Sequence, residues 1–500
     1  MMNRIDMLLD HLTMYRLLLY YLLVLLGTAI VMGLFHVAAY SPFAILVSAG
    51  LLVAVCWGSN RAFAWFLKLP HNPESSLITA LILSLIITPT SEPKDLLFPL
   101  MAGVLAMASK YLLTFRGKHI FNPAAVAVVL TALGPHQTAG WWIGSAAFMP
   151  FVVLGGLLVA RKLRVGLMVG AFLAASILTM LAFGGGELAA SLKHLARDSP
   201  VWFLGFVMLT EPMTSPATRT WRMIYGAVVG AVSAPLFHVG TLYFSPELAL
   251  VIGNALTFVG VPQVRQQFTL ERREKVAPDI ADFVFKPARP FAYRPGQYLE
   301  WTLPHHHTDS RGSRRYFTLA SSPTEDTVRI GVKFYKDSST YKHELAALRP
   351  GGHIMAAQLG GDFVLPKDQS RKLAFLAAGI GITPYRSMLK YLVDTNDRRD
   401  IVLVYGERTL EELAYRDVLA AAAKQLGTRL VYTLSEPAPD WTGPKGRISA
   451  ELVAQMIPDY HERLFYISGP QAMVQATRRT LHGLGVPAGH IRTDFFPGYA

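Results

Sequence analysis

Cysteine is nearly absent from this chain of 500 residues, which contains one, Cys56, inside an apolar run. A single cysteine excludes an internal disulfide framework, a zinc site with cysteine ligands and a cysteine-ligated iron–sulfur cluster. Charged residues are also scarce, at 16% of the chain, whereas apolar residues make up 52%. This composition is too apolar for a purely soluble protein and indicates a membrane protein.

Basic residues outnumber acidic ones, and the formal net charge is +13. These basic residues are scattered over loops without interleaved aromatic residues, so we expect no nucleic-acid partner. In a membrane protein such a surplus usually lies in cytoplasmic loops. The histidine triplet 305–307 precedes a loop-like composition, and adjacent histidines on an extended chain point apart. We therefore expect no metal site.

Apolar runs recur before residue 262, at 17–38, 42–57, 75–89, 96–114, 121–134, 141–160, 165–184, 200–210, 222–243 and 247–261. Several are shorter than the roughly 20 residues that a simple spanning helix needs. No small-residue cleavage site follows the first run, so we interpret it as a membrane helix and not as a signal peptide. Lys and Arg concentrate in alternate connecting segments, which predicts a multi-pass, bacterial-type inner (plasma) membrane protein with both termini in the cytoplasm.

The composition changes abruptly near residue 262. Segment 264–280 is rich in charge, and we interpret it as a linker. Residues 281–365 contain short alternating runs and tight-turn sequences, which predict an antiparallel β-barrel. From residue 372 onward, apolar strands are separated by helix-length segments, the pattern of a doubly wound parallel sheet. The predicted domains are residues 1–262, 268–368 and 369–500.

The segment RRYFTLASSP places Arg315 and Phe317 on one face of a predicted strand and Thr318 on the other. A guanidinium suits a diphosphate, and an aromatic side chain can cover a planar ring. Ser339 and Thr340 stand at a predicted helix start, where backbone N–H groups and hydroxyls can hold an anion. Taken alone, the arginine also fits a solvated strand residue.

Gly379 and Gly381, in LAAGIGITPYRSML, follow a predicted buried strand and open a helix. Glycine lets the backbone approach a pyrophosphate, and Thr383 can form a hydrogen bond to it. A Gly-x-Gly pair alone is a weak signal. The tripeptide SGP at 468–470 ends another predicted strand, at the carboxyl edge where such sheets bind ligands.

In order along residues 268–500, these motifs resemble the ferredoxin–NADP reductase superfamily. The resemblance implies an FAD-binding β-barrel domain, an NAD(P)-binding α/β domain and an NAD(P)H-dependent flavin oxidoreductase. It implies that Arg315 holds the FAD pyrophosphate, that Phe317 packs on the isoalloxazine and that Thr318 lies near its reactive nitrogen. Many relatives have Tyr and Ser at the positions of Phe317 and Thr318, and Cys at the position of Ser468.

The same resemblance assigns binding and catalytic residues. The implied FAD-binding residues are Arg315, Tyr316, Phe317, Thr318, Val332, Lys333, Ser339 and Thr340. The implied NAD(P)-binding residues are Gly379, Gly381, Ile382, Thr383, Pro384, Gly406, Arg408, Ser468, Gly469, Pro470 and Met473. Thr318 and Phe495 are the implied catalytic residues, although an aromatic tail that packs on its own domain fits Phe495 equally well. Arg408 could meet a 2′-phosphate and Glu407 would oppose one, so NADH and NADPH both stay open.

Polar residues and Pro interrupt the apolar spans in three stretches, HNPESSLITALILSLIITP, GKHIFNPAAVAVV and LTEPMTSPATRTWRMIYG. Irregular backbone at membrane depth is tolerated only where it faces protein or a polar cavity, and helix N-termini attract anions. Glu74 and Glu211 are acids at or within apolar spans, which indicates a functional role. Any one break also fits an ordinary helix end.

Over roughly residues 60–262, these stretches resemble the membrane D subunit of the Rnf complex and the B subunit of the sodium-pumping NADH:quinone oxidoreductase. The resemblance implies a transmembrane electron-transfer domain with about ten spans in inverted repeats and a bound flavin. Relatives attach FMN to a threonine of an outer loop, but the loop here is GPHQTAG, so we expect noncovalent FMN. The implied membrane cofactor site is Glu74, Ser75, Thr79, Lys118, Asn122, Pro123, Thr210, Glu211 and Ser215.

Together the motifs predict a lipid-embedded oxidoreductase that passes electrons from NAD(P)H through FAD to a membrane cofactor and on to an extracytoplasmic acceptor protein. One alternative is a membrane-anchored reductase of a soluble cytoplasmic acceptor. Another is a haem relay like that of ferric reductases, which needs paired histidines on neighbouring helices. Among the histidines of the membrane half, the candidates for such pairs are His36, His119, His136 and His238.

Overall fold

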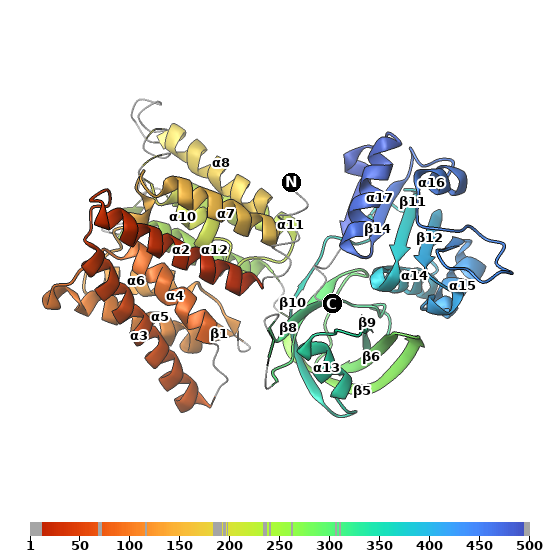
Figure 1. Ribbon diagram of the computed structural model, residues 1–500, viewed down its shortest axis with the longest axis horizontal. Helices are drawn as coiled ribbons and strands as arrows, with labels where there is room; N and C mark the ends of the chain where they lie inside the picture. Colours follow the sequence, from red (N-terminus) through yellow and green to blue (C-terminus); the bar gives the residue numbers. More distant parts are fainter. Residues whose placement is uncertain are drawn as a thin grey trace. The chain divides into compact units, whose positions relative to one another are not determined.

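The computed structural model describes residues 13–68, 73–115, 118–183, 193, 197, 199–233, 238–239, 242–261, 264–305, 308–309 and 312–494. Within these ranges, the side chains of Pro73, Lys118, Val239, Leu242 and Tyr243 are not described. The chain divides into two compact units, Met1–Pro262 and Gln263–Ala500 (Figure 1). Each unit has its own hydrophobic core.

Helices make up most of the first unit, which we call the helical unit. Its α-helices are α2 (Met14–Leu34), α3 (Pro42–Leu67), α4 (Pro73–Ile86), α5 (Leu97–Leu112), α6 (Pro123–Leu133), α7 (Met149–Leu163), α8 (Gly166–Phe183), α10 (Val201–Phe203), α11 (Arg219–Val232) and α12 (Pro246–Gly260). Its shorter elements are η1 (Pro93–Asp95), η2 (Trp142–Gly144), the π-helical η3 (Leu204–Met208), β1 (Thr114–Phe115), β2 (Lys118–His119), β3 (His238–Val239) and β4 (Leu242–Tyr243).

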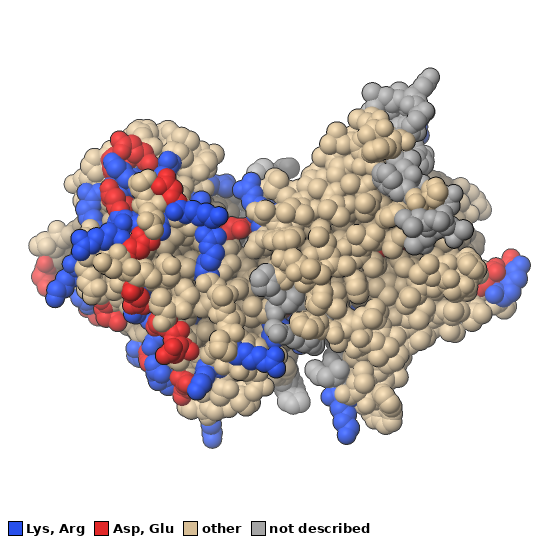
Figure 2. Space-filling model, turned by 180° about the vertical axis from the view of Figure 1, so that it is seen from behind, with Lys and Arg blue, Asp and Glu red and all other residues tan. Residues whose placement is uncertain are grey.

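Among the described residues, four helices are long and apolar enough to cross a membrane: Met14–Leu34, Pro42–Leu67, Pro93–Leu112 and Gly166–Phe183. Large apolar side chains such as Trp65 lie exposed on this unit. Figure 2 shows few charged side chains over it, whereas both signs of charge are dense over the second unit. These features indicate a membrane protein. The ten spans, the inverted repeats and the cytoplasmic termini stay predictions.

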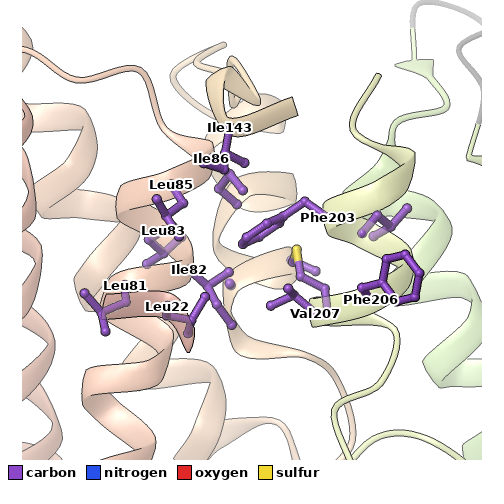
Figure 3. Close-up of a cluster of buried hydrophobic side chains, with 14 of the residues drawn as sticks. Leu22, Leu81, Ile82, Leu83, Leu85, Ile86, Ile143, Phe203, Phe206 and Val207 are labelled. Atoms are coloured by element: carbon purple, nitrogen blue, oxygen red, sulfur yellow. The ribbon is translucent and has the colours of Figure 1, made fainter. Parts of the chain in front are cut away.

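The core of the helical unit joins α2, α4, η2, α10 and η3 through aliphatic and aromatic side chains (Figure 3). Leu22, Leu83 and Phe203 are completely buried there. In α4, every side chain from Ile78 to Ile86 is buried, so neighbouring protein surrounds most of this 14-residue helix. A helix too short to span a membrane is tolerated at membrane depth when other segments of the protein surround it.

Two glycines allow α11 to pack closely against α8. A Cβ atom added at Gly226 would lie 2.3 Å from the carbonyl oxygen of Met168. One added at Gly230 would lie 2.2 Å from the carbonyl oxygen of Phe172. Small residues spaced by four in this way let membrane helices approach through their backbones.

The second unit begins with an antiparallel half-barrel of strand order β8, β7, β10, β5, β6, β9. Its elements are β5 (Arg265–Ala277), β6 (Ile280–Pro287), β7 (Tyr298–Thr302), β8 (Arg314–Thr318), β9 (Val328–Lys333), α13 (Thr340–Ala347) and β10 (His353–Gly360). Phe268, Phe283, Trp301 and Tyr341 are fully buried in its core. The predicted antiparallel architecture over these residues is confirmed.

The interpretation of segment 264–280 as a linker is wrong, because most of it is the long strand β5. Phe268 and Leu270 alternate with more exposed neighbours and enter the half-barrel core. The charged residues that follow them lie on the solvent side of the strand. The high charge density concealed an alternation that is typical of a half-exposed strand.

A five-stranded parallel sheet follows, with strand order β13, β12, β11, β14, β15. Its strands are β11 (Leu373–Ala378), β12 (Ile401–Glu407), β13 (Arg429–Leu434), β14 (Leu464–Ser468) and β15 (Ile491–Asp494). Its helices are η4 (Gly379–Ile382), α14 (Thr383–Thr395), η5 (Leu410–Glu412), α15 (Arg416–Leu426), α16 (Ala450–Met456), α17 (Gln471–Gly483) and η6 (Ala488–His490). The predicted parallel α/β architecture is confirmed. The strand order reverses between β11 and β14, where ligands bind in such sheets.

We expect Gly230→Ala to lower the thermal unfolding midpoint of the detergent-purified chain, because its methyl group would force α11 away from α8. Overpacking of this kind costs about 1–3 kcal/mol. Gly170, in α8, has open space where its Cβ would lie. Gly170→Ala is therefore the matched control, and it should leave the midpoint unchanged or raise it. Equal midpoints for the two variants would contradict the close packing.

Candidate functional site

Strand β8 carries the first predicted group of site residues. The Arg315 side chain is buried, and its guanidinium lies 5.0 Å from the ring centre of Tyr341. Its Nη1 donates to the carbonyl oxygen of Gly312 at 3.0 Å, which ties the strand to the preceding loop. The hydroxyl of Thr318 is buried and has no hydrogen-bond partner among the described residues. A buried hydroxyl without a partner is costly unless a ligand completes it.

The start of α13 is the second group, and its predicted helix is confirmed. Ser339 caps this helix, and its side chain accepts from the backbone N–H of Lys342. The N–H of Thr340 donates to Asp309 Oδ2 at 3.1 Å, and the N–H of Asp309 donates to Thr340 Oγ1 at 3.1 Å. His305 Nε2 also lies 2.9 Å from Thr340 Oγ1. An aspartate therefore occupies the anion-binding position at this helix start.

Two turns meet at the carboxyl edge of the parallel sheet. A Cβ at Gly381 would lie 2.4 Å from the carbonyl oxygen of Ser468 and 2.5 Å from the Cα of Gly469. The turn after β11 begins at Gly379, whose φ of +57° favours glycine. This contact brings the Gly379–Ile382 turn against the end of β14. Gly379, Gly381 and Gly469 carry no side chains, which favours close approach of a dinucleotide to the backbone.

The half-barrel and the parallel sheet contact each other next to these turns. A Cβ at Gly331, in β9, would lie 2.3 Å from the Tyr415 hydroxyl and 2.8 Å from Thr383 Cγ2. Tyr415 donates to the buried carboxylate of Asp282 in β6. Burial raises the pKa of Asp282, while this hydrogen bond opposes the rise. The two folds are thus in direct polar and backbone contact.

A family model described as the oxidoreductase NAD-binding domain matches residues 375–479. The chain is 30% identical over 237 residues to the stachydrine N-demethylase reductase subunit of Rhizobium meliloti, covering 46% of this chain and 66% of that protein. The C-terminal half is an FAD- and NAD(P)-binding domain of the ferredoxin–NADP reductase family. It is an NAD(P)H-dependent FAD oxidoreductase domain that binds NAD(P).

Further relatives are similar to this domain of the ferredoxin–NADP reductase family. The chain is 32% identical over 214 residues to an NADPH oxidoreductase of Mycobacterium tuberculosis, covering 41% of this chain and 54% of that protein. The crystal structure of a ferredoxin NADP⁺ reductase from Neisseria gonorrhoeae with bound FAD and NADP has a TM-score of 0.41 and 20% identity, covering 46% of this chain and 98% of that one. The chain spans about half to two thirds of the length of the curated relatives it matches. Nothing in these comparisons identifies the helical unit.

The remaining residues predicted to bind FAD lie on β8 and β9. The Tyr316 hydroxyl donates to Glu300 Oε2 at 2.7 Å, and the Phe317 ring lies 6.1 Å from that of Tyr341. Val332 is buried in the half-barrel core. Lys333 Nζ reaches Glu412 Oε2, 3.4 Å away in η5. Phe495 lies outside the described residues.

The predicted NAD(P)-binding residues converge on one edge of the parallel sheet. They lie in the turn and helix after β11, at the end of β12 and after β14, as the parallel strand pairing requires. Ile382, Thr383 and Pro384 are buried at the start of α14, and Met473 touches the Gly469 turn. Arg408 is largely exposed and pairs with Glu412 at 2.6 Å. Gly406, Ser468 and Pro470 lie at or directly after strand ends.

In the helical unit, the second and third sequence motifs meet directly. Asn122 caps α6 and accepts from the N–H of Ala125, while its Nδ2 donates to Glu211 Oε2 at 2.8 Å. Thr214 also donates to that oxygen, at 3.2 Å, and Pro123 begins the helix. A broken span thus starts with a partly buried polar contact to a carboxylate.

Other residues of the predicted membrane site make separate contacts. Glu74 accepts from Arg16, and Lys110 Nζ donates to Ser75 Oγ at 3.0 Å. Thr79 and Thr210 donate to backbone carbonyl oxygens one turn earlier in their own helices. Ser215 donates its backbone N–H to the Glu211 carbonyl oxygen. The side chain of Lys118 is not among those that the structure describes.

Sequence reasoning missed four further members of the Asn122–Glu211 cluster. The Asn254 side chain accepts from the Asn122 N–H at 2.8 Å and donates to the Tyr225 hydroxyl at 2.9 Å. His119 Nε2 lies 3.5 Å from Glu211 Oε1, and Lys110 is close enough for its charge to attract that carboxylate. A signal was available, because an Asn or Lys inside an apolar run is rare without a role.

The four candidate haem histidines are all among the described residues. His36, His136 and His238 are exposed and lie outside helices. His119 lies in β2, next to Glu211. These four histidines therefore provide no facing pair on neighbouring helices of the kind that a haem relay needs.

The residues of the C-terminal half fit FAD on structural grounds. The unpartnered hydroxyl of Thr318 can donate a hydrogen bond to a ring nitrogen or accept one from a ring N–H. The buried guanidinium of Arg315 and the helix start at Thr340 are groups that hold a diphosphate. When bound, FAD accepts a hydride and can release single electrons.

We expect Thr318→Val to raise the thermal midpoint of the FAD-free chain and to lower the FAD affinity. Valine has nearly the same shape, and it removes a buried hydroxyl whose missing partner costs about 1–3 kcal/mol. The measurement is thermal unfolding with and without FAD, together with an FAD titration. Thr318→Ser keeps the hydroxyl and should bind FAD as the wild type does. A variant that is less stable without FAD would refute the unpartnered hydroxyl.

We also expect Asp309→Asn to bind FAD about tenfold more tightly than the wild type, because a carboxylate and a pyrophosphate repel each other at one helix start. Riboflavin has no phosphate, so its affinity should not change. Flavin fluorescence titration measures both. Asp326→Asn, in an exposed loop, is the charge-matched control. Equal gains for FAD and riboflavin would show that Asp309 does not compete with the pyrophosphate.

Proposed function

We propose that this chain is a membrane-bound oxidoreductase that passes electrons from NAD(P)H through FAD to a cofactor in the helical unit, and on to an acceptor at the outer face. The reductase domain supplies the first part of this path. The proposal for the second part rests on one observation, the partly buried cluster around Asn122 and Glu211. Such a cluster in an apolar unit is costly to build and indicates a function.

In the reductase domain, the protein's contribution is to position two rings and to exclude water. We propose that Arg315 and Thr340 hold the FAD pyrophosphate and that Thr318 fixes the ring edge. The turn at Gly379–Ile382 receives the NAD(P)H pyrophosphate, with the SGP turn at 468–470 beside it. The contact between β9 and Thr383 supports this arrangement, because it brings the two proposed sites together.

For the helical unit we propose noncovalent FMN, at the start of α6. Three observations support an anion or ring at this place: the helix start capped by Asn122, the neighbouring Lys110, and the polar side chains of Asn254 and Tyr225. The resemblance of the three motifs to the Rnf and sodium-pumping families supports a flavin in particular. The acceptor beyond it is proposed to be an extracytoplasmic protein.

A membrane-anchored reductase of a soluble cytoplasmic acceptor is the second candidate. It is favoured by the name of one relative, which is the reductase subunit of an N-demethylase. It is also favoured by the closed hydrogen bonding of the cluster, in which Asn122, Asn254 and Tyr225 satisfy one another. In this case the helical unit serves as an anchor.

The flavin content of the detergent-purified chain distinguishes the two candidates. We expect acid extraction to release one FAD and one FMN per chain, and NADH or NADPH to bleach the bound flavin. Glu211→Gln should lose FMN and keep FAD, because it weakens the two hydrogen bonds by which Glu211 holds Asn122 and Thr214 in place around the proposed site. Glu92→Gln, at an exposed ion pair with Lys94, is the control. One FAD and no FMN in the wild type would favour the anchored reductase.

A further inference from the structure

A buried hydroxyl at the end of β12 has two acceptors for its one proton. Tyr405 is fully buried, and its Oη lies 3.1 Å from Glu407 Oε1. The same oxygen lies 3.4 Å from the carbonyl oxygen of Gly379, the first residue of the turn after β11. The N–H of Ala414 donates to this hydroxyl at 3.3 Å, which holds the oxygen in place. The Tyr405 hydroxyl can donate a full hydrogen bond to Glu407 or to the Gly379 carbonyl oxygen, but not to both at once.

Charged groups surround Glu407 on several elements. Lys333, from the half-barrel strand β9, and Arg408, the next residue, both stabilise its ionised form. Glu412, from η5, opposes ionisation, and burial opposes it most strongly. The Glu407 side chain is only 9% exposed, so a dinucleotide phosphate cannot contact it over much of its surface. Its effect on a ligand must therefore pass through a neighbour or through its charge.

We propose that Glu407 is a positioning residue for the nicotinamide dinucleotide, acting through Tyr405 on the Gly379 turn. When Glu407 is neutral, its carboxyl proton can be donated to Tyr405 Oη, and the Tyr405 proton turns to the Gly379 carbonyl oxygen. When Glu407 is ionised, it accepts the hydrogen bond from the Tyr405 hydroxyl. The Gly379 carbonyl oxygen then loses this donor. The inference rests on the proposed placement of the dinucleotide at this turn and is independent of the helical unit.

The charge of Glu407 acts in the same direction. Its carboxylate, when formed, adds a negative charge at the carboxyl edge of the sheet, where the pyrophosphate is proposed to bind. Burial raises the pKa of Glu407 from its ordinary range to about 7. The carboxyl group is thus neutral below about pH 7 and ionised above it. NAD affinity should therefore fall as the pH rises through this value.

The test is a calorimetric titration of the full-length, detergent-purified chain with oxidised NAD, between pH 5.5 and 8.5. Oxidised NAD does not reduce an oxidised flavin, and it lacks the 2′-phosphate of NADP, which itself titrates near pH 6. We expect the dissociation constant of the wild type to rise about fivefold across pH 7. Glu407→Gln should bind as the wild type does at pH 6, and should show no change with pH.

A second variant separates the Tyr405 link from a simple effect of charge or folding. The hydrogen bond from Tyr405 lowers the pKa of Glu407. Tyr405→Phe should therefore reduce the amplitude of the pH dependence and move its remaining midpoint upward, because Glu407 then acts by its charge alone. A simple effect of charge would move the midpoint but keep the full amplitude. Glu411→Gln, at an exposed acid of η5, is the charge-matched control and should keep the wild-type curve.

Each outcome decides the inference. A wild-type pH dependence in Glu407→Gln, or a pH dependence of full wild-type amplitude in Tyr405→Phe, would overturn it. A flat curve in Glu407→Gln with a reduced amplitude in Tyr405→Phe supports it. A wild-type chain that binds NAD equally well at every pH overturns it while leaving the oxidoreductase function intact. A chain that binds no NAD at any pH would instead contradict the placement of the dinucleotide.

Discussion

The hydrogen bonds and ion pairs between the half-barrel and the parallel sheet are the constraint on which the reductase depends. Hydride transfer needs two rings held within near contact, so the two folds must keep a fixed relation. Arg386, from α14, forms a bidentate ion pair with Glu325 at 2.7 and 3.1 Å and donates to the Ala320 carbonyl oxygen. Asp282 and Tyr415 form a second tie. Removal of one partner would leave the other as a buried, uncompensated charge or polar group, so these contacts are costly to break.

The helical unit follows the same rule in a different solvent. Apolar surroundings cannot hydrogen-bond a free N–H, C=O or carboxylate, so every break in a helix must find its partners within the protein. Asn122 meets this need three times, as the cap of α6, as the donor to Glu211 and through its N–H to Asn254. The breaks that the sequence displays are thus points at which distant segments must join, and this is why they can form a site.

Much of the reductase could be predicted from the chain alone, because its signals are local. Strands such as 401–406 and the glycine turn at 379–381 have period and composition that few other folds share. The loop contact between Asp309 and Thr340 could not be predicted, since it joins residues 31 positions apart. Strand β5 was missed for a different reason, because its many charged residues resemble those of a linker. In the helical unit, Asn254 and Glu211 are distant in sequence, and only the packing of α12 against α6 brings them to one place.

Fusion of the two units in one chain changes what each has to accomplish. A separate reductase subunit must find its acceptor by diffusion, whereas under the proposed function the tethered domain would meet an acceptor in the same chain at an effective concentration that the tether sets. A tethered reductase therefore needs no extended docking surface of high affinity for that partner. Selection can then act on the electron path itself, and the buried polar clusters at Glu211 and Glu407 are the places in each unit where charge, burial and backbone geometry already constrain one another.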